Sequence, residues 1–124
     1  MEKIWLNSYP AGVPHTVDPD HYQSLPHLLE ESFRKNAARP FSVCMDHWMS
    51  YGQLDELSSS LGAWLQAQGL EPGARIAIML PNIPQFAVAM AAVLRAGSTC
   101  VNVNPLYTAR ELEHQLKDSG ATAI

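Results

Sequence analysis

The sequence is poor in charge and cysteine, and it lacks an apolar run long enough to span a membrane. Of its 124 residues, 16% are charged and the formal net charge is −4. No basic run occurs, so we do not expect nucleic acid as a partner. The longest apolar stretch, Ile83 to Leu94, is shorter than the roughly 20 residues that cross a bilayer. The opening Met1 to Asn7 is too short and polar for a signal peptide, and we expect a cytoplasmic protein.

Common catalytic fingerprints are also missing. The sequence has no GxGxxG or GxxxxGK[ST] loop for phosphates and no GxSxG elbow for a serine nucleophile. The histidines, which lack metal-ligand spacing, are His15, His21, His27, His47 and His114. We interpret His114 as a surface residue, since no nucleophile lies nearby. Cys44 and Cys100 stand among apolar neighbours and indicate buried reduced thiols, with a disulfide or a reactive thiol as the alternative.

Residues 1–24 are predicted to form an extended arm. Its prolines are Pro10, Pro14 and Pro19. Proline removes a backbone donor and biases the preceding residue to extended conformations, so we expect no helix in the arm. Its aromatic residues are Trp5, Tyr9 and Tyr22. These side chains either pack on the chain's own domain or reach a second subunit.

Residues 25–124 are predicted to form an α/β region. Helical spacing of apolar residues and terminal signals predict helices from Leu25 to about Ala37, Ser50 to Gly69, Ile83 to Arg95, and Thr108 to Ser119. Two short runs around Asp46 predict a β-hairpin. The runs 75–80, 99–103 and 121–124 alternate with helices, which is typical of a parallel sheet. The order is therefore βαβαβ, and the last strand is short.

The helix after Ser50 has the clearest start signal, because Ser50 and Gln53 match a capping box. The residues expected on its buried face are Leu54, Leu57, Leu61, Trp64 and Leu65. The serine run 58–60 lacks a neighbouring lysine, so we interpret it as solvated helix surface and not as a phosphate loop. A second capping box joins Thr108 and Glu111, and Asn82 is expected to cap the helix that contains Pro84.

The helix 83–95 is apolar on nearly every side, which is typical of a buried helix. It carries more apolar surface than three strands and two other helices easily cover. Leaving such side chains in water forfeits roughly 25 cal/mol per Å². We therefore expect an incomplete domain, with further sheet and helix following, or a homodimer interface on the same face.

One connection is a candidate ligand site. The loop Asn102 to Thr108 follows the carboxyl end of a predicted parallel strand, where open α/β sheets place ligands. An Asn-rich loop with a proline is also ordinary turn chemistry. Both interpretations stay open at this stage.

Several motifs together resemble a known family. Residues 49–54 (MSYGQL) and 94–97 (LRAG) resemble the first and second core motifs of adenylate-forming enzymes, in their usual order, with RIAIMLPN between them. Residues 102–116 (NVNPLYTARELEHQL) and the opening WLNSYP resemble the bacterial long-chain-fatty-acid–CoA ligases specifically. The resemblance covers essentially the whole chain. Ala109 departs from it, since these enzymes commonly have proline there.

The resemblance implies the N-terminal, truncated part of an AMP-binding domain over residues 25–124. Such ligases convert a fatty acid and Mg-ATP to an acyl-adenylate and pyrophosphate, and coenzyme A then displaces AMP. Their phosphate loop, metal-binding glutamate and catalytic lysine lie downstream, so no catalytic, cofactor-binding or metal residue carries over to this chain. The resemblance also implies a homodimer and peripheral contact with the inner membrane.

Other functions remain to be weighed. A close relative would activate an aromatic or short-chain acid. A non-catalytic interaction module would pair with itself or with a full-length synthetase. A small flavodoxin-like binding protein is disfavoured, because no phosphate-binding loop follows the strand 75–80.

Overall fold

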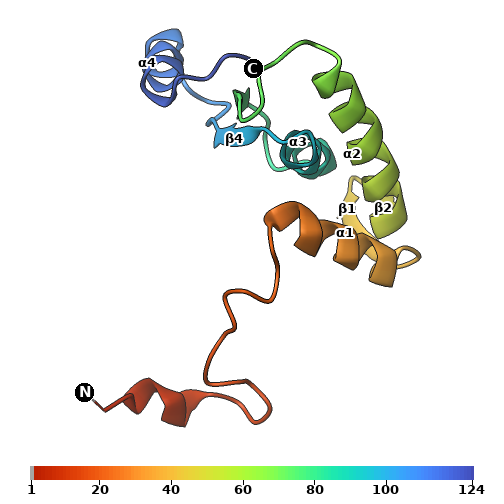
Figure 1. Cartoon of the computed structure of the whole chain (residues 1–124), viewed down its shortest axis with the longest axis vertical. Coiled ribbons are helices and arrows are strands. Elements are labelled where there is room, and N and C mark those ends of the chain that lie inside the picture. The colour runs from red at the N-terminus through yellow and green to blue at the C-terminus, as the bar shows by residue number, and fades with distance from the viewer. Residues whose placement is uncertain (1) are drawn as a thin grey trace.

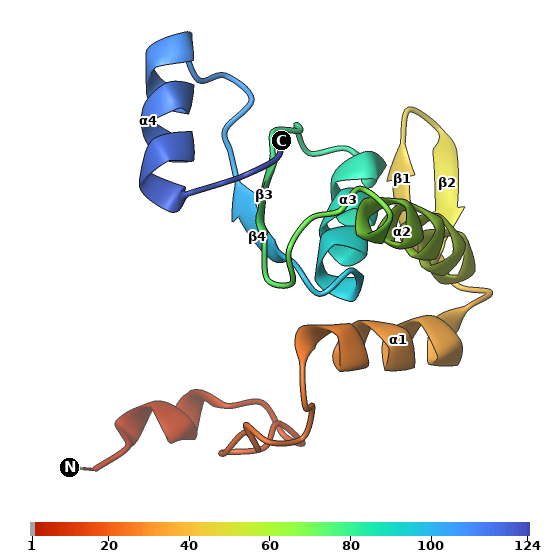
Figure 2. The same cartoon turned by 45° about the horizontal axis from the view of Figure 1, so that its top comes forward.

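The computed structural model describes residues 2–124 (Figure 1). Its elements are η1 (Ile4–Ser8), α1 (Leu25–Asn36), β1 (Pro40–Cys44), β2 (His47–Ser50), α2 (Tyr51–Gln66), β3 (Arg75–Ile78), α3 (Pro84–Arg95), β4 (Thr99–Asn102) and α4 (Ala109–Ser119). The predicted α/β class and the order of helices and strands are confirmed. Figure 2 shows α3 and α4 on opposite sides of the β3–β4 pair.

The parallel sheet is short. β3 pairs with β4 in register from Arg75 opposite Thr99 to Ile78 opposite Asn102. The predicted third strand is reduced to one parallel bridge, between Ile76 and Ala123. β3 ends at Ile78 and not at the predicted position 80, because the last bond from its neighbour is Val103 N–H to the Ile78 carbonyl, at 3.0 Å.

The hairpin forms as the sequence indicates. β1 and β2 pair antiparallel, with Cys44 opposite His47. The two residues between them, Met45 and Asp46, have φ of 48° and 63°. Positive φ at both central residues is the geometry of a type I′ turn, whose twist matches that of the flanking strands. The hairpin lies beside α2 and α3 (Figure 2).

Helix ends follow the sequence with two exceptions, and one of them is α2, which ends at Gln66 and not at the predicted Gly69. At α2 the Ser50 Oγ accepts from Gln53 N–H at 3.1 Å while Gln53 Oε1 accepts from Ser50 N–H at 2.8 Å, so the capping box is confirmed. The Thr108 capping box is confirmed as well. The predicted cap by Asn82 is wrong: the N-cap of α3 is Ile83 and no side chain caps it. Pro84 occupies the first helical position, which shifts the cap one residue later than expected.

The core has two parts. Phe33, Leu54 and Ala91 join α1, α2 and α3 in one cluster. Ile76, Ile78 and Val93 join α3 to the sheet in another. α3 lies between them, and its apolar side chains are buried or half-buried. Helices and strands meet it from both sides, but it still borders uncovered space: Ala89 and Val93 line one apolar groove, and Phe86 and Ala87 line a second. The expectation that the described elements do not cover α3 completely therefore agrees with the structure.

The N-terminal arm corrects the expectation that it contains no helix. Ile4–Ser8 forms a 3-10 helix, because a single turn of this kind fits ahead of Pro10. Of the alternatives for its aromatic residues, packing on the chain's own domain holds for Tyr22, whose ring lies 5.7 Å from that of His27 on α1, whereas Trp5 and Tyr9 are 51% and 41% exposed. Both views show the arm leading away from the helices (Figures 1 and 2). Residue 1 of the predicted arm lies outside the described residues.

Candidate functional site

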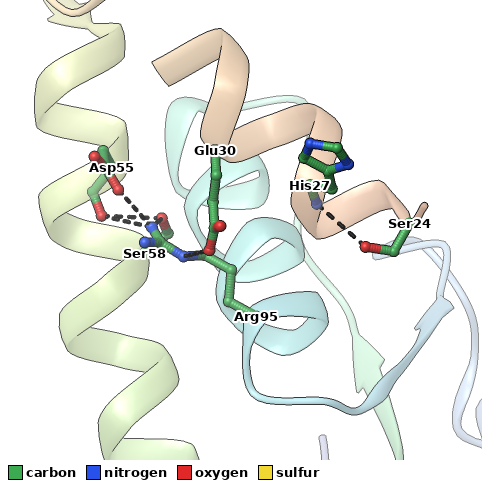
Figure 3. Close-up of polar contacts among 6 residues, drawn as sticks. All are labelled: Ser24, His27, Glu30, Asp55, Ser58 and Arg95. Atoms are coloured by element: carbon green, nitrogen blue, oxygen red, sulfur yellow. Dashed lines mark hydrogen bonds and ion pairs between the residues drawn. The ribbon is translucent and has the colours of Figure 1, made fainter. Parts of the chain in front are cut away.

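A polar cluster fixes the meeting point of three helices (Figure 3). Arg95, the last residue of α3, points to α2. Its Nη1 donates to the Asp55 carboxylate at 2.7 Å, to the Asp55 carbonyl at 2.9 Å and to Ser58 Oγ at 2.9 Å. Figure 3 also shows the start of α1, where Ser24 Oγ accepts from His27 N–H at 3.2 Å. The cluster therefore joins residues far apart in the sequence.

Arg95 also reaches α1. Its Nε lies 3.7 Å from Glu30 Oε1, and its guanidinium carbon lies 5.7 Å from the centre of the Phe33 ring. The Arg95 side chain is 17% exposed. A planar guanidinium suits several acceptors at once, and here they come from the protein itself. Arg95 is thus engaged in holding helices together, and its Nη1 is already shared among three oxygens.

Small residues bring α2 and α3 close enough for this cluster. A side-chain carbon added at Gly62 would lie 3.2 Å from the Ala92 carbonyl oxygen. Ser58, one turn earlier, is 0% exposed. The interpretation of residues 58–60 as solvated surface is therefore wrong for Ser58. A serine is small enough to lie between packed helices, and its hydroxyl donates to the Asp55 carbonyl at 3.2 Å while accepting from Arg95.

The other end of α2 borders an apolar groove of about 400 Å³. Its lining residues include Leu61, Trp64, Leu65, Met79, Leu80 and Ile124. Trp64 is 57% exposed and Leu57 is 48% exposed, so two of the five residues expected on the buried face of α2 are exposed. α3 covers only part of that face, because it packs against the helix where Ser58 and Gly62 allow close approach.

The candidate loop after β4 is a hydrogen-bonded turn. Asn104 Oδ1 accepts from Leu106 N–H at 3.0 Å, and the Asn104 carbonyl accepts from Tyr107 N–H at 3.1 Å. Gln115 Nε2 donates to the Asn102 carbonyl at 2.9 Å. These bonds use the polar groups of the loop internally, which favours turn chemistry over ligand binding.

A cavity of about 290 Å³ lies beside this loop, lined by Tyr107, Glu111, His114, Gln115 and Asp118. A hydrogen bond from the Thr108 backbone N–H lowers the pKa of Glu111, and a bond from the Thr108 hydroxyl lowers it further. Glu111 is thus an anion held by its capping box. Within residues 2–124 no three His, Cys, Asp or Glu side chains gather to hold a metal ion.

The cysteines are not bonded to each other. Cys44 and Cys100 are free and half-buried, so the disulfide alternative is wrong. Burial raises the pKa of the Cys100 thiol, and its Sγ lies 3.6 Å from the Met90 carbonyl. A thiol with a raised pKa is a weak nucleophile. Cys100 therefore behaves as a packing residue.

Comparison with known proteins decides the family. A family model described as AMP-binding enzyme matches residues 29–124. The chain belongs to the AMP-binding enzyme family. It is 52% identical, over 125 aligned positions and all of its length, to the long-chain-fatty-acid–CoA ligase of Escherichia coli. The chain spans 22% of the length of that relative.

Two solved structures share the fold. MbtA of Mycobacterium smegmatis is 34% identical with a TM-score of 0.76, over 82% of this chain and 19% of that one. The N-terminal subdomain of Klebsiella oxytoca NpsA is 26% identical with a TM-score of 0.77, over 82% of this chain and 27% of that one. The incomplete domain that the sequence indicated is therefore confirmed.

The nucleotide and metal that the AMP-binding family implies do not fit the residues present. The described residues contain no cluster of carboxylates for a metal, and Arg95 is taken up by Asp55, Ser58 and Glu30. Lys35 and Lys117 pair with Glu31 and Glu113 on their own helices. These three cations are therefore already neutralised by the chain's own carboxylates.

The Arg95 cluster escaped prediction from the sequence, although a signal for it existed. Leu54, Ser58 and Gly62 recur every four residues and are the buried residues of α2. Two of the three are small, and they face a helix rich in alanine. Small residues at this spacing indicate helices in close contact, which the hydrophobic pattern alone does not reveal.

No described helix is long and apolar enough to cross a membrane.

Proposed function

We propose that this chain is the N-terminal part of a long-chain-fatty-acid–CoA ligase. The observation that carries the proposal is the 52% identity, over the whole of this chain, to a relative named long-chain-fatty-acid–CoA ligase. The sequence motifs of residues 102–116 support the same assignment. A ligase for aromatic acids is disfavoured, because the NpsA N-terminal subdomain, solved in complex with anthranilyl-AMSN, is only 26% identical to this chain.

The whole protein would join a fatty acid to coenzyme A at the expense of ATP. A carboxylate is a poor electrophile, so the acid is first converted to an acyl-adenylate with release of pyrophosphate. The thiol of coenzyme A then displaces AMP and forms the thioester. Residues outside this chain would bind the nucleotide, the metal and coenzyme A.

Within that protein the chain would act as scaffold. Residues 1–24 would be an arm, and residues 25–124 the first part of the AMP-binding domain. None of its residues is proposed to be catalytic, to bind a cofactor or to ligate a metal. Its contribution would be to support a site that the following polypeptide builds.

Two measurements test this proposal. The longer polypeptide, supplied with ATP, magnesium, coenzyme A and oleate, should form oleoyl-CoA and release AMP, and it should use benzoate far less well. A clear preference for benzoate would contradict the long-chain assignment. The 124-residue chain alone should bind neither ATP nor coenzyme A in calorimetry, and a micromolar affinity would contradict the scaffold role.

A non-catalytic interaction module is the second candidate, and the exposed arm favours it. Ile4, Trp5 and Tyr9 are 68%, 51% and 41% exposed, which suits contact with a second copy or with the membrane surface. The same arm would serve a homodimeric, membrane-associated ligase of the cytoplasm. Sedimentation and vesicle flotation, each with and without residues 1–24, separate these uses. If removing the arm abolishes dimers, the arm contacts a second copy, and if it abolishes vesicle binding, the arm contacts the membrane. If it changes neither, the arm serves neither use.

A further inference from the structure

The polar attachment between the N-terminal arm and α1 depends on one side chain, His27. Among the hydrogen bonds of residues 2–124, a single one joins residues 2–23 to the rest of the chain: Gln23 donates its backbone N–H to His27 Nδ1 at 3.3 Å. No ion pair of the described residues crosses the same boundary. The Tyr22 ring also meets the His27 ring, edge-on, with centres 5.7 Å apart. Both described contacts of the arm therefore end at the same imidazole.

The hydrogen bond to His27 Nδ1 exists only while the imidazole is neutral. A neutral imidazole has one N–H donor and one acceptor nitrogen, whereas both nitrogens of the charged form are donors. Because Gln23 donates, Nδ1 must be the acceptor and the ring proton must be on Nε2. A second proton, added to Nδ1, would point at the Gln23 N–H and remove the bond. Histidine side chains change charge between about pH 5 and 8, so acidification is the event that breaks this contact.

The charged groups around His27 come from its own helix and from the arm. Glu31 follows one turn later on α1. Its pKa is lowered below the ordinary value of 4.5, first by the hydrogen bond from Lys35 and more weakly by the charges of His21 and His27. Glu31 is therefore an anion throughout the range in which histidines change charge. On the arm, His21 lies beside Tyr22, with ring centres 4.5 Å apart.

The other helices packed against α1 direct their charges elsewhere. Arg95 of α3 reaches α1 at Glu30, with 3.7 Å between Nε and Oε1. Asp55 of α2 is hydrogen-bonded to the same arginine. Figure 3 shows Glu30 directed at Arg95 and the His27 ring directed away from that cluster. The charge of His27 is therefore free to change without disturbing the helical junction.

We infer that His27 is a pH-dependent switch for the direction of the arm: the neutral ring fixes residues 2–23 relative to α1, and the charged ring lets the arm pivot at Gln23 and Ser24. The His27 side chain is exposed, so a proton reaches it from solvent without opening the core. Ser24 caps α1 in both forms, because its Oγ accepts from the backbone N–H of His27 and not from the ring. The helix therefore stays intact while the arm is released. Because Ile4 and Trp5 are exposed on the arm, the switch decides in which direction these apolar side chains are presented.

The mobility of the arm in the longer protein tests this inference, which holds whether or not that protein is a ligase. A rhodamine dye on the N-terminal amine is followed by time-resolved fluorescence anisotropy, in which a fast component reports segmental motion on the nanosecond scale. Parent and variants are measured at about pH 8 and about pH 5. His27→Gln keeps an acceptor oxygen at both pH values, and His27→Phe keeps a ring beside Tyr22 without an acceptor. His21→Gln is the matched control, because the His21 ring also meets Tyr22 but accepts no described hydrogen bond.

We expect the amplitude of the fast component to at least double on acidification in the parent and in His21→Gln. It should stay low at both pH values in His27→Gln and high at both in His27→Phe. An equal amplitude at the two pH values in the parent would overturn the inference. So would a pH response that persists in His27→Gln or disappears in His21→Gln. Circular dichroism of the same samples should show unchanged helix content, and a loss of helix in the acidified parent would overturn the inference, because the motion would then come from unfolding.

Discussion

The two ends of α2 have similar sequence patterns and opposite surroundings. Its first half packs Leu54 and Ser58 against α1 and α3. Arg95 of α3 donates hydrogen bonds to oxygens of Asp55 and Ser58 in this half. Its second half turns Trp64 to a groove that nothing in residues 2–124 fills. One half is a finished helical junction, and the other borders an open apolar groove. Apolar spacing identifies the face of a helix, but the neighbouring elements decide how much of it is buried.

The largest expected effect comes from Gly62→Leu, which should break the helical junction. A single added carbon would already lie 3.2 Å from the Ala92 carbonyl, so a leucine must push α2 and α3 apart. We expect a loss of about 3 kcal/mol or more in the free energy of unfolding. Urea unfolding followed by circular dichroism measures it. Ala63→Leu, on the exposed neighbouring position, is the control and should change stability little.

Arg95→Met should have the next largest effect. The change keeps most of the apolar stem but removes the donor shared by Asp55 and Ser58. We expect a loss of about 2 kcal/mol, below the full cost of breaking a buried pair because Asp55 is 45% exposed. A double-mutant cycle with Asp55→Asn should be non-additive. Strict additivity would contradict a stabilising role of the Arg95 cluster. So would an equal loss of unfolding free energy from Arg110→Met, which changes an exposed arginine.

Much of this contrast was predictable, and the reason for the rest is physical. Capping boxes at Ser50 and Thr108 and the hairpin around Asp46 depend on residues close in sequence, and the sequence predicted these elements correctly, although Met45 belongs to the turn and not to the first strand. The burial of Ser58 and the exposure of Trp64 depend on where α3 crosses α2. That crossing follows from small residues on both helices, which the hydrophobic pattern ignores. The candidate loop 102–108 was located correctly, and its internal hydrogen bonds made it a turn.

Thr108→Ala measures the contribution of a purely local interaction, with which the helix–helix contacts can be compared. Removing the hydroxyl breaks one half of the capping box of α4, where Thr108 Oγ1 accepts from Glu111 N–H at 3.4 Å. We expect a loss of about 1 kcal/mol, as is usual for an N-cap. The loss should be the same in the short chain and in the longer protein. A difference between them would mean that α4 also belongs to an unfinished interface.

The same cap predicts a weak pH dependence. Bonds from Thr108 lower the folded pKa of Glu111 below its ordinary value of 4.5. A lowered folded pKa stabilises the native state above the unfolded pKa, and this contribution is lost as pH falls through the folded pKa. Unfolding free energy measured from pH 6 downward should therefore fall less steeply for Glu111→Gln than for the parent. An unchanged slope would contradict the role of the charged form.

The smallest effect should come from Trp64→Gln in the 124-residue chain. Trp64 is 57% exposed there, so we expect a change within about 0.5 kcal/mol. In the longer protein the same change should destabilise clearly, since the indole would then be buried. Equal changes in unfolding free energy in both proteins would contradict the proposed difference between the two ends of α2.

Hydrogen exchange read by mass spectrometry tests the central claim most directly, by comparing the 124-residue chain with the longer protein. The account predicts that amides of α3 and of the first half of α2 exchange slowly in both. Amides at Met79 and Ile124 should exchange fast in the short chain and slowly in the longer protein. Equal protection at these two positions in both proteins, or protection of the α2–α3 junction only in the longer one, would contradict the account.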